Sequence, residues 1–323
     1  MKIWYTGFNL YQQFHPFKEH IVDSFKATEY ADLKDIVLGH TYIILQNDNI
    51  AFYGGVNSNL PLEEIKGTKE IIAIDNITYI LYNSGTIKKL DTATGRIADI
   101  PNFLNVENPE NDEDFVNKIA CGTKINVAVT RNNKIYNIPN RLEYKGRRIK
   151  QIVTGHEHCL ILDSNGDVYS FGCGLRGQLG HGTLENETNP TLIEALAGIK
   201  IEKIAAGGWH SCAISVTGDL YSWGWNSNGQ LAIPTAENIS VLASPQPIYF
   251  EDPDCNVDDV VCGSKHTVAR IGNQFYGAGW NKYKQLGKID DINIYEFKLM
   301  KDFSLEKILL LKCGPWCTAI ITE

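Results

Sequence analysis

The stretch VTGHEHCLILDSNGDVYSFGCGLRGQLG at residues 153–180 decides the fold, because it returns twice further along the chain. It recurs as AAGGWHSCAISVTGDLYSWGWNSNGQL at 205–231 and as VCGSKHTVARIGNQFYGAGWNKYKQLG at 261–287. The copies share one template: a Gly-x-x-His turn, an apolar strand, a second turn, an aromatic strand that ends in glycine, and a loop that closes on Gln-Leu. Repetition with a period of roughly 50 residues indicates a repeat architecture.

The glycine that opens each copy, here called the anchor, reveals weaker copies elsewhere. The three clear copies have anchors Gly155, Gly207 and Gly263, and each is followed three residues later by a histidine, namely His158, His210 and His266. Similar first halves begin at positions 39, 75, 122 and 314, with Asp75 in the place of the glycine. The sequence therefore contains seven candidate first halves.

The two ends of the chain complement each other. The chain opens with KIWYTGFNLYQQF at 2–14, which resembles the second half of a repeat, and it stops at Glu323 after a first half. A strand around Ile3–Gly7 that pairs with the sheet begun by Ile308–Ile321 would leave no unpaired edge at the seam. We therefore predict an all-β fold, a single seven-bladed β-propeller over 1–323 whose ring is closed by pairing of the N-terminal strand with the C-terminal blade.

The template residues have structural roles in such a propeller. Apolar and aromatic residues at alternating positions are typical of strands packed between neighbouring blades. Asn165-Gly166 and Thr217-Gly218 lie between paired strands, where a tight hairpin needs positive φ. We expect the anchor glycines to let backbones crowd near the ring axis. We expect a ring nitrogen of each template histidine to bond a loop carbonyl within or between blades.

Composition limits the possible functions. Hydrophobic residues make up 43% of the 323 residues, and no apolar run approaches the ~20 residues of a membrane span. The net charge is −8, from 30 basic and 38 acidic residues, which disfavours direct binding to nucleic-acid phosphates. We expect a soluble intracellular protein that does not bind membranes.

The repeat accounts for most of the eight cysteines. Cys121, Cys262 and Cys313 each precede an anchor, and equivalent positions in successive blades lie too far apart for routine disulfide pairing. Cys313 and Cys317 have C-x3-C spacing, which differs from the C-x2-C spacing of redox motifs. We interpret the cysteines as small buried side chains in a reducing compartment.

The Gly-x-x-His turn, the aromatic strand and the Asn-x-x-Gly-Gln-Leu loop resemble the repeat of the regulator of chromosome condensation family, most specifically over 151–287. The family fold is a seven-bladed propeller. Within the family, the stretch 205–234 and the short chain are most similar to the domain-containing protein 1 branch. That resemblance implies a non-enzymatic, chromatin-linked adaptor in nucleus and cytoplasm. It also implies a Jumonji-type 2-oxoglutarate oxygenase as partner and an influence on histone H3 lysine methylation and mitotic chromosome stability.

Two other functions within this family serve as alternatives. The founding member is a guanine-nucleotide exchange factor for the small GTPase Ran, so exchange on a small GTPase is the alternative function. The founding member also reaches nucleosomes through a basic arm, so direct nucleosome binding is the second alternative, although we expect no such arm before the first strand at Ile3. The plant photoreceptor members resemble a Gly-Trp-Arg-His-Thr repeat, whereas Trp209 and Trp316 lie two places after their anchors, so we expect no light-sensing cage.

No catalytic constellation stands apart from the template. The histidines recur because the repeat recurs, and the chain has no phosphate-binding P-loop motif. We therefore expect no catalytic residues, no metal site and no cofactor.

Two segments break the repeat and are candidate insertions, 101–114 and 233–259. Loops of a propeller lie on its two faces and carry binding function. The second segment combines prolines and acids with the candidate partner-binding residues Val241, Leu242, Tyr249 and Phe250. A docking segment and a merely tolerated insertion are equally consistent with this composition.

Three further residues are candidates for partner binding: His156, Arg176 and Trp209. His156 and Arg176 lie outside the template positions, and tryptophan is enriched at interfaces. Trp225 and Trp280 occupy one repeat position, which favours a shared packing role. The basic run at 145–150 is a candidate nuclear localisation signal, although a solvated turn between blades is favoured.

Overall fold

The structure is a computed structural model that describes residues 1–47, 51–55, 67–101, 114–234, 239–250, 252 and 255–323. Its first strands are β1 (Lys2–Phe8), β2 (Ile21–Glu29), β3 (Asp35–Leu38), β4 (Tyr42–Gln46), β5 (Ala51–Gly55), β6 (Thr68–Ile74), β7 (Ile77–Tyr82), β8 (Ile87–Asp91), β9 (Arg96–Asp99), β10 (Val116–Cys121), β11 (Asn126–Thr130), β12 (Ile135–Asn137) and β13 (Asn140–Arg141). The remaining elements are β14 (Ile149–Thr154), β15 (His158–Asp163), β16 (Val168–Gly172), β17 (Glu187–Leu192), the 3-10 helix η3 (Glu194–Leu196), β18 (Ile201–Ala206), β19 (His210–Ser215), β20 (Leu220–Trp225), β21 (Val241–Pro247), β22 (Asp259–Cys262), β23 (His266–Ile271), β24 (Gln274–Trp280), β25 (Asn293–Asp302), β26 (Ile308–Gly314) and β27 (Cys317–Thr322).

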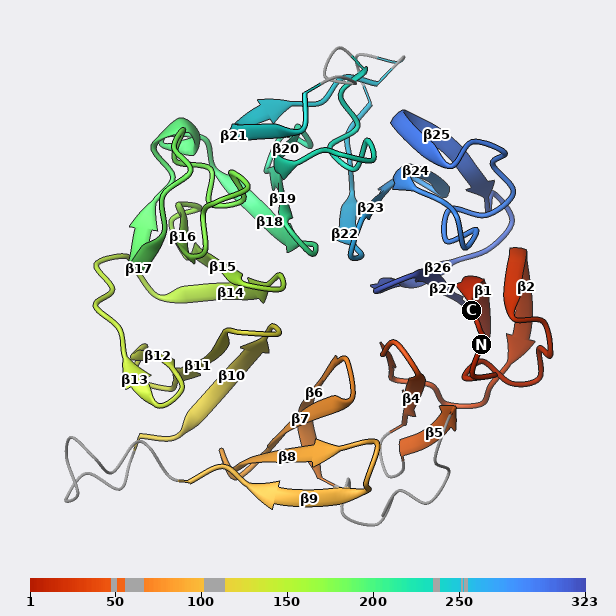
Figure 1. Cartoon of the computed structure of the whole chain (residues 1–323), viewed down its shortest axis with the longest axis horizontal. Helices are drawn as coiled ribbons and strands as arrows, with labels where there is room; N and C mark the ends of the chain where they lie inside the picture. The colour runs from red at the N-terminus through yellow and green to blue at the C-terminus, as the bar shows by residue number, and fades with distance from the viewer. Residues whose placement is uncertain (48–50, 56–66, 102–113, 235–238, 251, 253–254) are drawn as a thin grey trace.

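These strands form antiparallel sheets arranged around an open centre (Figure 1). In each complete blade the first strand lies innermost and the fourth lies at the rim, as in β14-β15-β16-β17 and β18-β19-β20-β21. The described residues contain no α-helix, which confirms the all-β prediction. The arrangement of the sheets around a common centre confirms the propeller architecture.

The number of complete blades differs from the prediction. Six sheets are four-stranded blades, whereas the sheet β3-β4-β5 has three strands among the described residues. The expected seven-bladed propeller, with seven complete repeats, was therefore wrong: six blades are complete. The first half of the repeat at anchor 39 forms the expected hairpin of β3 and β4.

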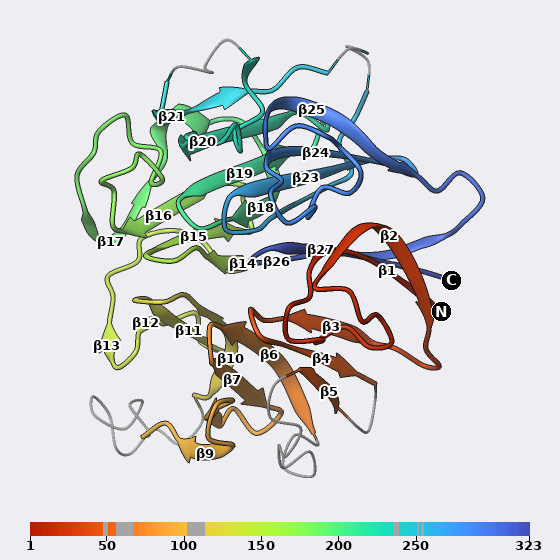
Figure 2. The same cartoon turned by 45° about the vertical axis from the view of Figure 1, so that its right-hand side comes forward.

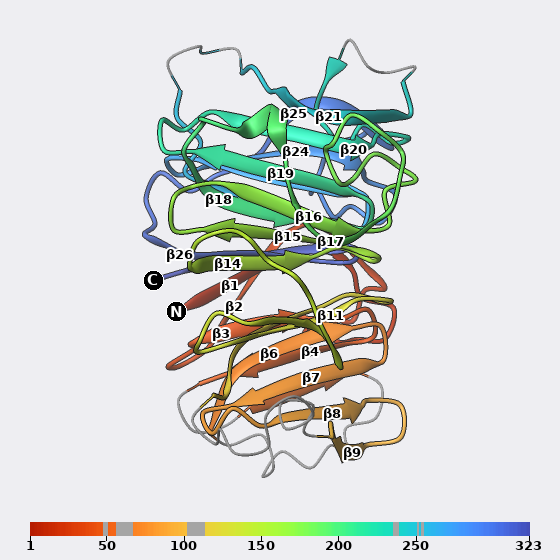
Figure 3. The ribbon, with the colours of Figure 1, turned by 90° about the vertical axis from the view of Figure 1, so that its left-hand side faces the viewer.

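The seam joins the two ends of the chain within one blade, with strand order β2-β1-β27-β26. Strand β1 pairs with β27 from Lys2↔Thr322 to Gly7↔Cys317. Trp4 adds a side-chain bond, because its indole N–H donates to the Thr322 hydroxyl at 3.2 Å. Figures 2 and 3 show the two termini side by side. The predicted closure by the N-terminal strand is confirmed.

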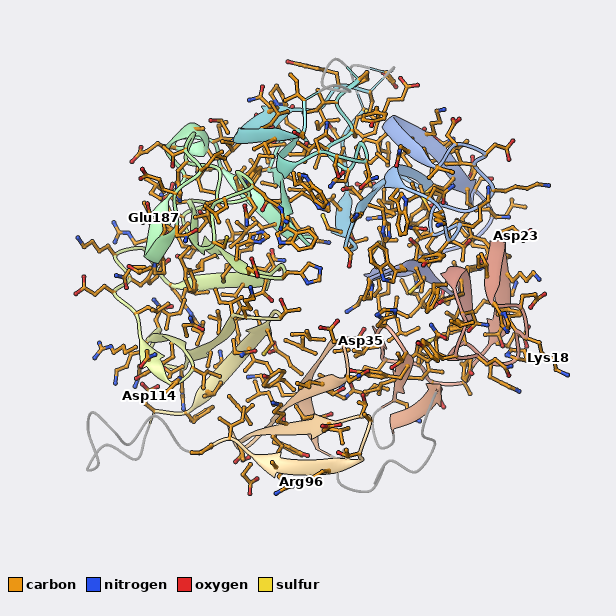
Figure 4. All side chains as sticks on the ribbon, in the orientation of Figure 1. Lys18, Asp23, Asp35, Arg96, Asp114 and Glu187 are labelled. Atoms are coloured by element: carbon orange, nitrogen blue, oxygen red, sulfur yellow. The ribbon has the colours of Figure 1, made fainter. Side chains whose placement is uncertain are left out.

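The hydrophobic core is divided among the contacts between neighbouring blades. One cluster joins Leu160 and Leu162 of β15 with Ala213 of β19 and Trp223 of β20. Another joins Ile3 and Tyr5 of β1 with residues of β3 and β4 across the seam. Side chains fill the space between the sheets around the ring (Figure 4), so each blade is stabilised mainly by its neighbours.

The anchor glycines bring neighbouring turns into backbone contact, as expected. A Cβ atom on Gly155 would lie 2.2 Å from the carbonyl oxygen of Gly207, and one on Gly207 would lie 2.6 Å from that of Gly263. Real Cβ atoms do not approach oxygen so closely, so a larger residue would push the blades apart. Space, rather than an unusual φ, requires glycine at these anchors.

The segment 233–259 contains a strand that the sequence pattern did not reveal. Strand β21 is the fourth strand of its blade and pairs with β20 through Trp225↔Val241 and Gly224↔Leu242. The segment is therefore in part a blade strand. The other candidate insertion, 101–114, lies outside the described residues except at its two end residues.

All eight cysteines are free. Cys262 and Cys212 lie closest, with sulfur atoms 3.8 Å apart across two blades. Burial raises the pKa of both Cys121 and Cys262, which suits the interpretation of these cysteines as buried apolar groups. Within the described ranges, no helix is long and apolar enough to cross a membrane.

Truncating a core side chain of the seam should destabilise the whole ring. Ile3 is completely buried, and Ile3→Ala should cost about 2–5 kcal/mol of unfolding free energy through lost burial and a cavity. The matched control is Leu305→Ala, because Leu305 is 98% exposed and its truncation should change stability by less than about 0.5 kcal/mol. Urea unfolding of both variants checks this, and equal stabilities would contradict the closure.

Candidate functional site

A repeated side-chain latch joins neighbouring blades beneath one face of the ring. The Ser211 hydroxyl donates to the carbonyl of Gln178 at 2.9 Å and lies 2.9 Å from Nε2 of His158. Because the hydroxyl proton is used on the carbonyl, His158 must donate through Nε2. The same arrangement recurs as His210–Thr267–Gln230 and as His266–Thr318–Gln285.

The latch corrects the expected role of the template histidines. Only the Nε2 atom of each ring contacts a hydroxyl of the next blade, and the hydroxyl, not the ring, bonds the loop carbonyl. Burial lowers the pKa of His158 to about 3, with smaller contributions from His210 and His156. Burial followed by His210 also lowers the pKa of His266 to about 3. These imidazoles are neutral structural donors at physiological pH.

Above the latch, a backbone bond holds two template positions together in the three clear repeats and in the seam blade. The acceptor is the backbone carbonyl of the residue two places after the anchor. The donor is the backbone N–H of the residue that follows the glycine near the end of the third strand. Trp225 N–H donates to the Trp209 carbonyl at 2.9 Å, and Trp280 N–H donates to that of Lys265 at 2.8 Å. Gly224 permits this contact, because its φ is 105° and a Cβ would lie 2.7 Å from the Trp209 oxygen.

The side chains at these positions form a continuous band across several blades. We call it the aromatic arc and define it as His156, Arg176, Trp209, Trp225, Lys265, Trp280, Tyr283, Trp316 and Phe8. Its ring centroids are 4.8 Å apart for His156–Trp209, 5.3 Å for Trp209–Trp225, 4.9 Å for Trp280–Trp316 and 5.0 Å for Phe8–Tyr283. All of its members except the buried Phe8 are half-buried, so they present part of their surface to solvent.

Two cations bridge the rings of the arc. The guanidinium carbon of Arg176 lies 4.1 Å from the Trp209 ring centroid and 5.1 Å from that of Trp225. The ammonium of Lys265 lies 5.0 Å from the Trp225 centroid and 5.6 Å from that of Trp280. Cation–π contacts of this kind are worth about 0.5–2 kcal/mol. The arc is therefore an ordered surface rather than a set of independent side chains.

The arc lies on one face of the ring, which we call the arc face. This face carries the turns between first and second strands and the loops between third and fourth strands, because antiparallel strands return to the same end of a blade. His156, Arg176 and Trp209 all lie on it and contact one another.

The four candidates from the segment 233–259 do not join the arc as a group. Val241 and Leu242 are half-buried in β21. Phe250 packs into the core and stacks on Phe297 with ring centroids 5.2 Å apart. Tyr249 alone is open to solvent, with 86% of its surface exposed.

Sequence reasoning missed Lys265, Tyr283 and Trp316 as members of a common surface. Trp209, Lys265 and Trp316 occupy one template position, two residues after their anchors. Arg176 and Tyr283 occupy another, and each reaches a tryptophan of the next blade. Aligning the repeats and then comparing equivalent positions of successive blades would have revealed these residues as one band.

The centre of the ring is a second candidate site. A cavity of about 560 Å³ is lined by the innermost strands and their turns. Ion pairs at its wall join the innermost strands of neighbouring blades. Lys203 pairs with Asp259, and Lys312 pairs with Asp35 at 3.0 Å. Figure 4 labels Asp35 at the inner edge of the ring and Glu187 at the rim. Among the described residues, no group of three or more His, Cys, Asp or Glu side chains is placed to hold a metal ion.

Two models of a known repeat family match the blades described above. Residues 165–214 and 217–270 match the model of the regulator of chromosome condensation (RCC1) repeat, and residues 149–178 and 201–230 match a second model of that repeat. This chain carries RCC1 repeats. The resemblance predicted from the sequence is thereby confirmed, and its most specific part coincides with the blades that hold most of the arc.

Among curated proteins, the chain is similar to RCC1 domain-containing protein 1. It is 40% identical to the human protein over 212 residues, which cover 54% of this chain and 56% of the relative. It is 39% identical to the mouse protein over 210 residues, covering 54% of this chain and 55% of the relative. The chain thus spans just over half the length of these curated relatives.

Among solved structures, the RCC1-type propeller is similar to Prp20p from Saccharomyces cerevisiae, a structure described with the binding of Prp20p to Gsp1p and histones. The TM-score is 0.81 with 16% identity, covering 99% of this chain and 91% of Prp20p. At this identity the likeness shows the fold alone.

Protonation of the latch histidines should make stability depend on pH. Unfolded histidine has a pKa near 6.5, whereas His158 and His266 titrate near pH 3 in the fold, so the unfolded state binds more protons below about pH 6.5. His158 and His266 should each therefore remove about 2 kcal/mol of stability between pH 7 and pH 5.

Urea unfolding of wild type and His158→Gln across this range tests the effect. The variant should be less stable at pH 7 and should show a smaller loss towards pH 5. The exposed His20 provides the control, since His20→Gln should leave the pH dependence unchanged. Parallel pH profiles for wild type and His158→Gln would contradict the role of the latch.

Proposed function

We propose that this protein is a non-enzymatic interaction scaffold that binds a protein partner through the arc face. The observation that carries the proposal is the arc itself, in which four half-buried indoles and two cations form one ordered band. Tryptophan and arginine are the residue types that most often dominate binding energy at protein interfaces. A scaffold needs such anchors on a rigid support, and the propeller supplies it.

Part of the exposed apolar surface lies on the arc face. The loops between third and fourth strands carry Leu10, Tyr11, Leu175, Leu184, Ile239 and Ile292, with exposed fractions between 38% and 64%. These loops belong to four blades and all lie on the arc face. Apolar side chains around an aromatic centre are typical of a protein-binding surface.

The state of the template histidines supports a non-enzymatic function. General acid–base catalysis needs a group that titrates near neutral pH and reaches a substrate. His158 and His266 are fully buried, engaged in the latches and neutral at physiological pH. Their recurrence therefore reflects blade packing.

The finer identity of the partner rests on family resemblance. Similarity to RCC1 domain-containing protein 1 over half the chain supports a chromatin-linked adaptor. In this proposal it binds a Jumonji-type 2-oxoglutarate oxygenase, influences histone H3 lysine methylation and mitotic chromosome stability, and resides in nucleus and cytoplasm. Exchange of guanine nucleotide on a small GTPase is the alternative, supported by the Prp20p-like fold and the binding of Prp20p to Gsp1p.

Removing an arc indole should weaken partner binding without unfolding the ring. Trp280 and Trp316 are half-buried and lie outside the hydrophobic clusters between blades, so Trp280→Leu and Trp316→Leu should keep the wild-type melting temperature within a few degrees. Each should lower affinity roughly 30-fold, the effect of losing a 2 kcal/mol hot spot.

The test is quantitative affinity purification of tagged wild type and variants, with partner identification by mass spectrometry. Tyr249→Ser is the matched control, because Tyr249 is exposed on the segment 233–259 away from the arc. Loss of the partner with Tyr249→Ser and retention with both tryptophan variants would move docking to that segment. A small GTPase bound only after nucleotide removal, in place of an oxygenase, would favour exchange.

A further inference from the structure

The two cations of the arc lie over aromatic rings and form no ion pair among the described residues. Neither the Arg176 guanidinium nor the Lys265 ammonium makes a salt bridge or a side-chain hydrogen bond with a carboxylate there. Glu157 interacts electrostatically with Arg176, but its carboxylate is paired with Lys124 and bonded by the Cys173 thiol. The charged groups of Arg176 and Lys265 therefore have no ion-pair partner within the part of the chain that the structure describes.

This positive charge is local. The whole chain carries a net charge of −8, so general attraction would favour basic partners over acidic ones. In a protein with a negative net charge, these two cations attract an acidic partner only through short-range contacts. The partner that complements it carries its carboxylates where the two cations lie.

The guanidinium of Arg176 lies close to two indole rings without using its N–H groups on a carboxylate. Its central carbon lies 4.1 Å from the Trp209 ring centroid and 5.1 Å from that of Trp225. A guanidinium can bind one carboxylate through two parallel hydrogen bonds. The half-buried setting lowers the local dielectric and strengthens such a pair relative to one in open water.

The two cations lie beside one ring, which favours a ligand that presents two acidic groups on the same side. Arg176 and Lys265 both lie near the Trp225 ring, at 5.1 Å and 5.0 Å from its centroid, although they come from different blades. Side chains two residues apart in an extended segment point to the same side. Acidic residues at alternate positions of an extended peptide can therefore face the two cations together, while the residues between them face away.

We propose that the arc binds an extended acidic segment of a partner protein, with alternate Asp or Glu residues on Arg176 and Lys265 and an apolar residue over Trp280 and Trp316. This inference rests on the proposed function, because it names the chemistry of the segment that the scaffold recognises. The exposed Leu175 beside Arg176 provides a further apolar contact at one end of the band.

The experiment is selection of displayed random 12-residue peptides on the immobilised full chain, followed by anisotropy measurements with the recovered peptides. We expect peptides enriched in Asp and Glu at alternate positions with an aromatic or aliphatic residue nearby. Arg176→Gln and Lys265→Gln should each weaken binding about tenfold, and raising the salt concentration should weaken wild-type binding. Lys282→Gln is the control, because Lys282 is exposed in an adjacent loop and lies over no ring.

The outcomes separate this inference from the proposed function. Peptides without acidic enrichment, no recovered peptides, or binding unaffected by Arg176→Gln and Lys265→Gln would overturn the acidic-segment inference. If Trp280→Leu and Trp316→Leu still removed the cellular partner, the scaffold proposal would stand alone. If acidic peptides bound through both cations while partner capture ignored the arc, the inference would stand and the proposed docking function would fail.

Discussion

The hydroxyl that joins each template histidine to the neighbouring blade is the interaction on which the rest of the structure depends. Ser211 accepts from His158 and donates to Gln178, so one small side chain fixes a turn, a strand and a loop from two blades. Its burial excludes water that would compete for these bonds. The anchor glycine is part of the same arrangement, because a Cβ on Gly155 would lie 2.3 Å from Cε1 of the His158 ring.

The arc follows directly from this register. Because the latches fix how neighbouring blades are aligned, equivalent template positions of successive blades lie side by side on the arc face. Positions that the fold does not need for packing are then free to vary, as in Trp209, Lys265 and Trp316. A repeat protein thus builds a binding surface from residues that are far apart in sequence and equivalent in the template.

The sequence was sufficient to predict the blade hairpins, the anchor glycines and the seam, because each depends on local residue types that recur. Fourth strands could not be predicted in this way. They pair mainly through their backbones at the rim, so β17, β21 and β25 share no residue pattern, and β21 went unrecognised within 233–259. The contact of Arg176 with Trp209 depends on the order of blades in the ring, which sequence spacing does not contain.

The seam also determines the order in which the molecule can be completed. Trp4 bonds Thr322, 318 residues later, so the blade that contains β1 cannot be completed before β27 has been synthesised. Until then the apolar side chains of β1, including Ile3 and Tyr5, lack their neighbours in β27, and the strand remains an unpaired edge. Such long-range pairing forms slowly and exposes intermediates to aggregation. The topology of the ring therefore leaves this edge of β1 without its partner for as long as β27 is missing.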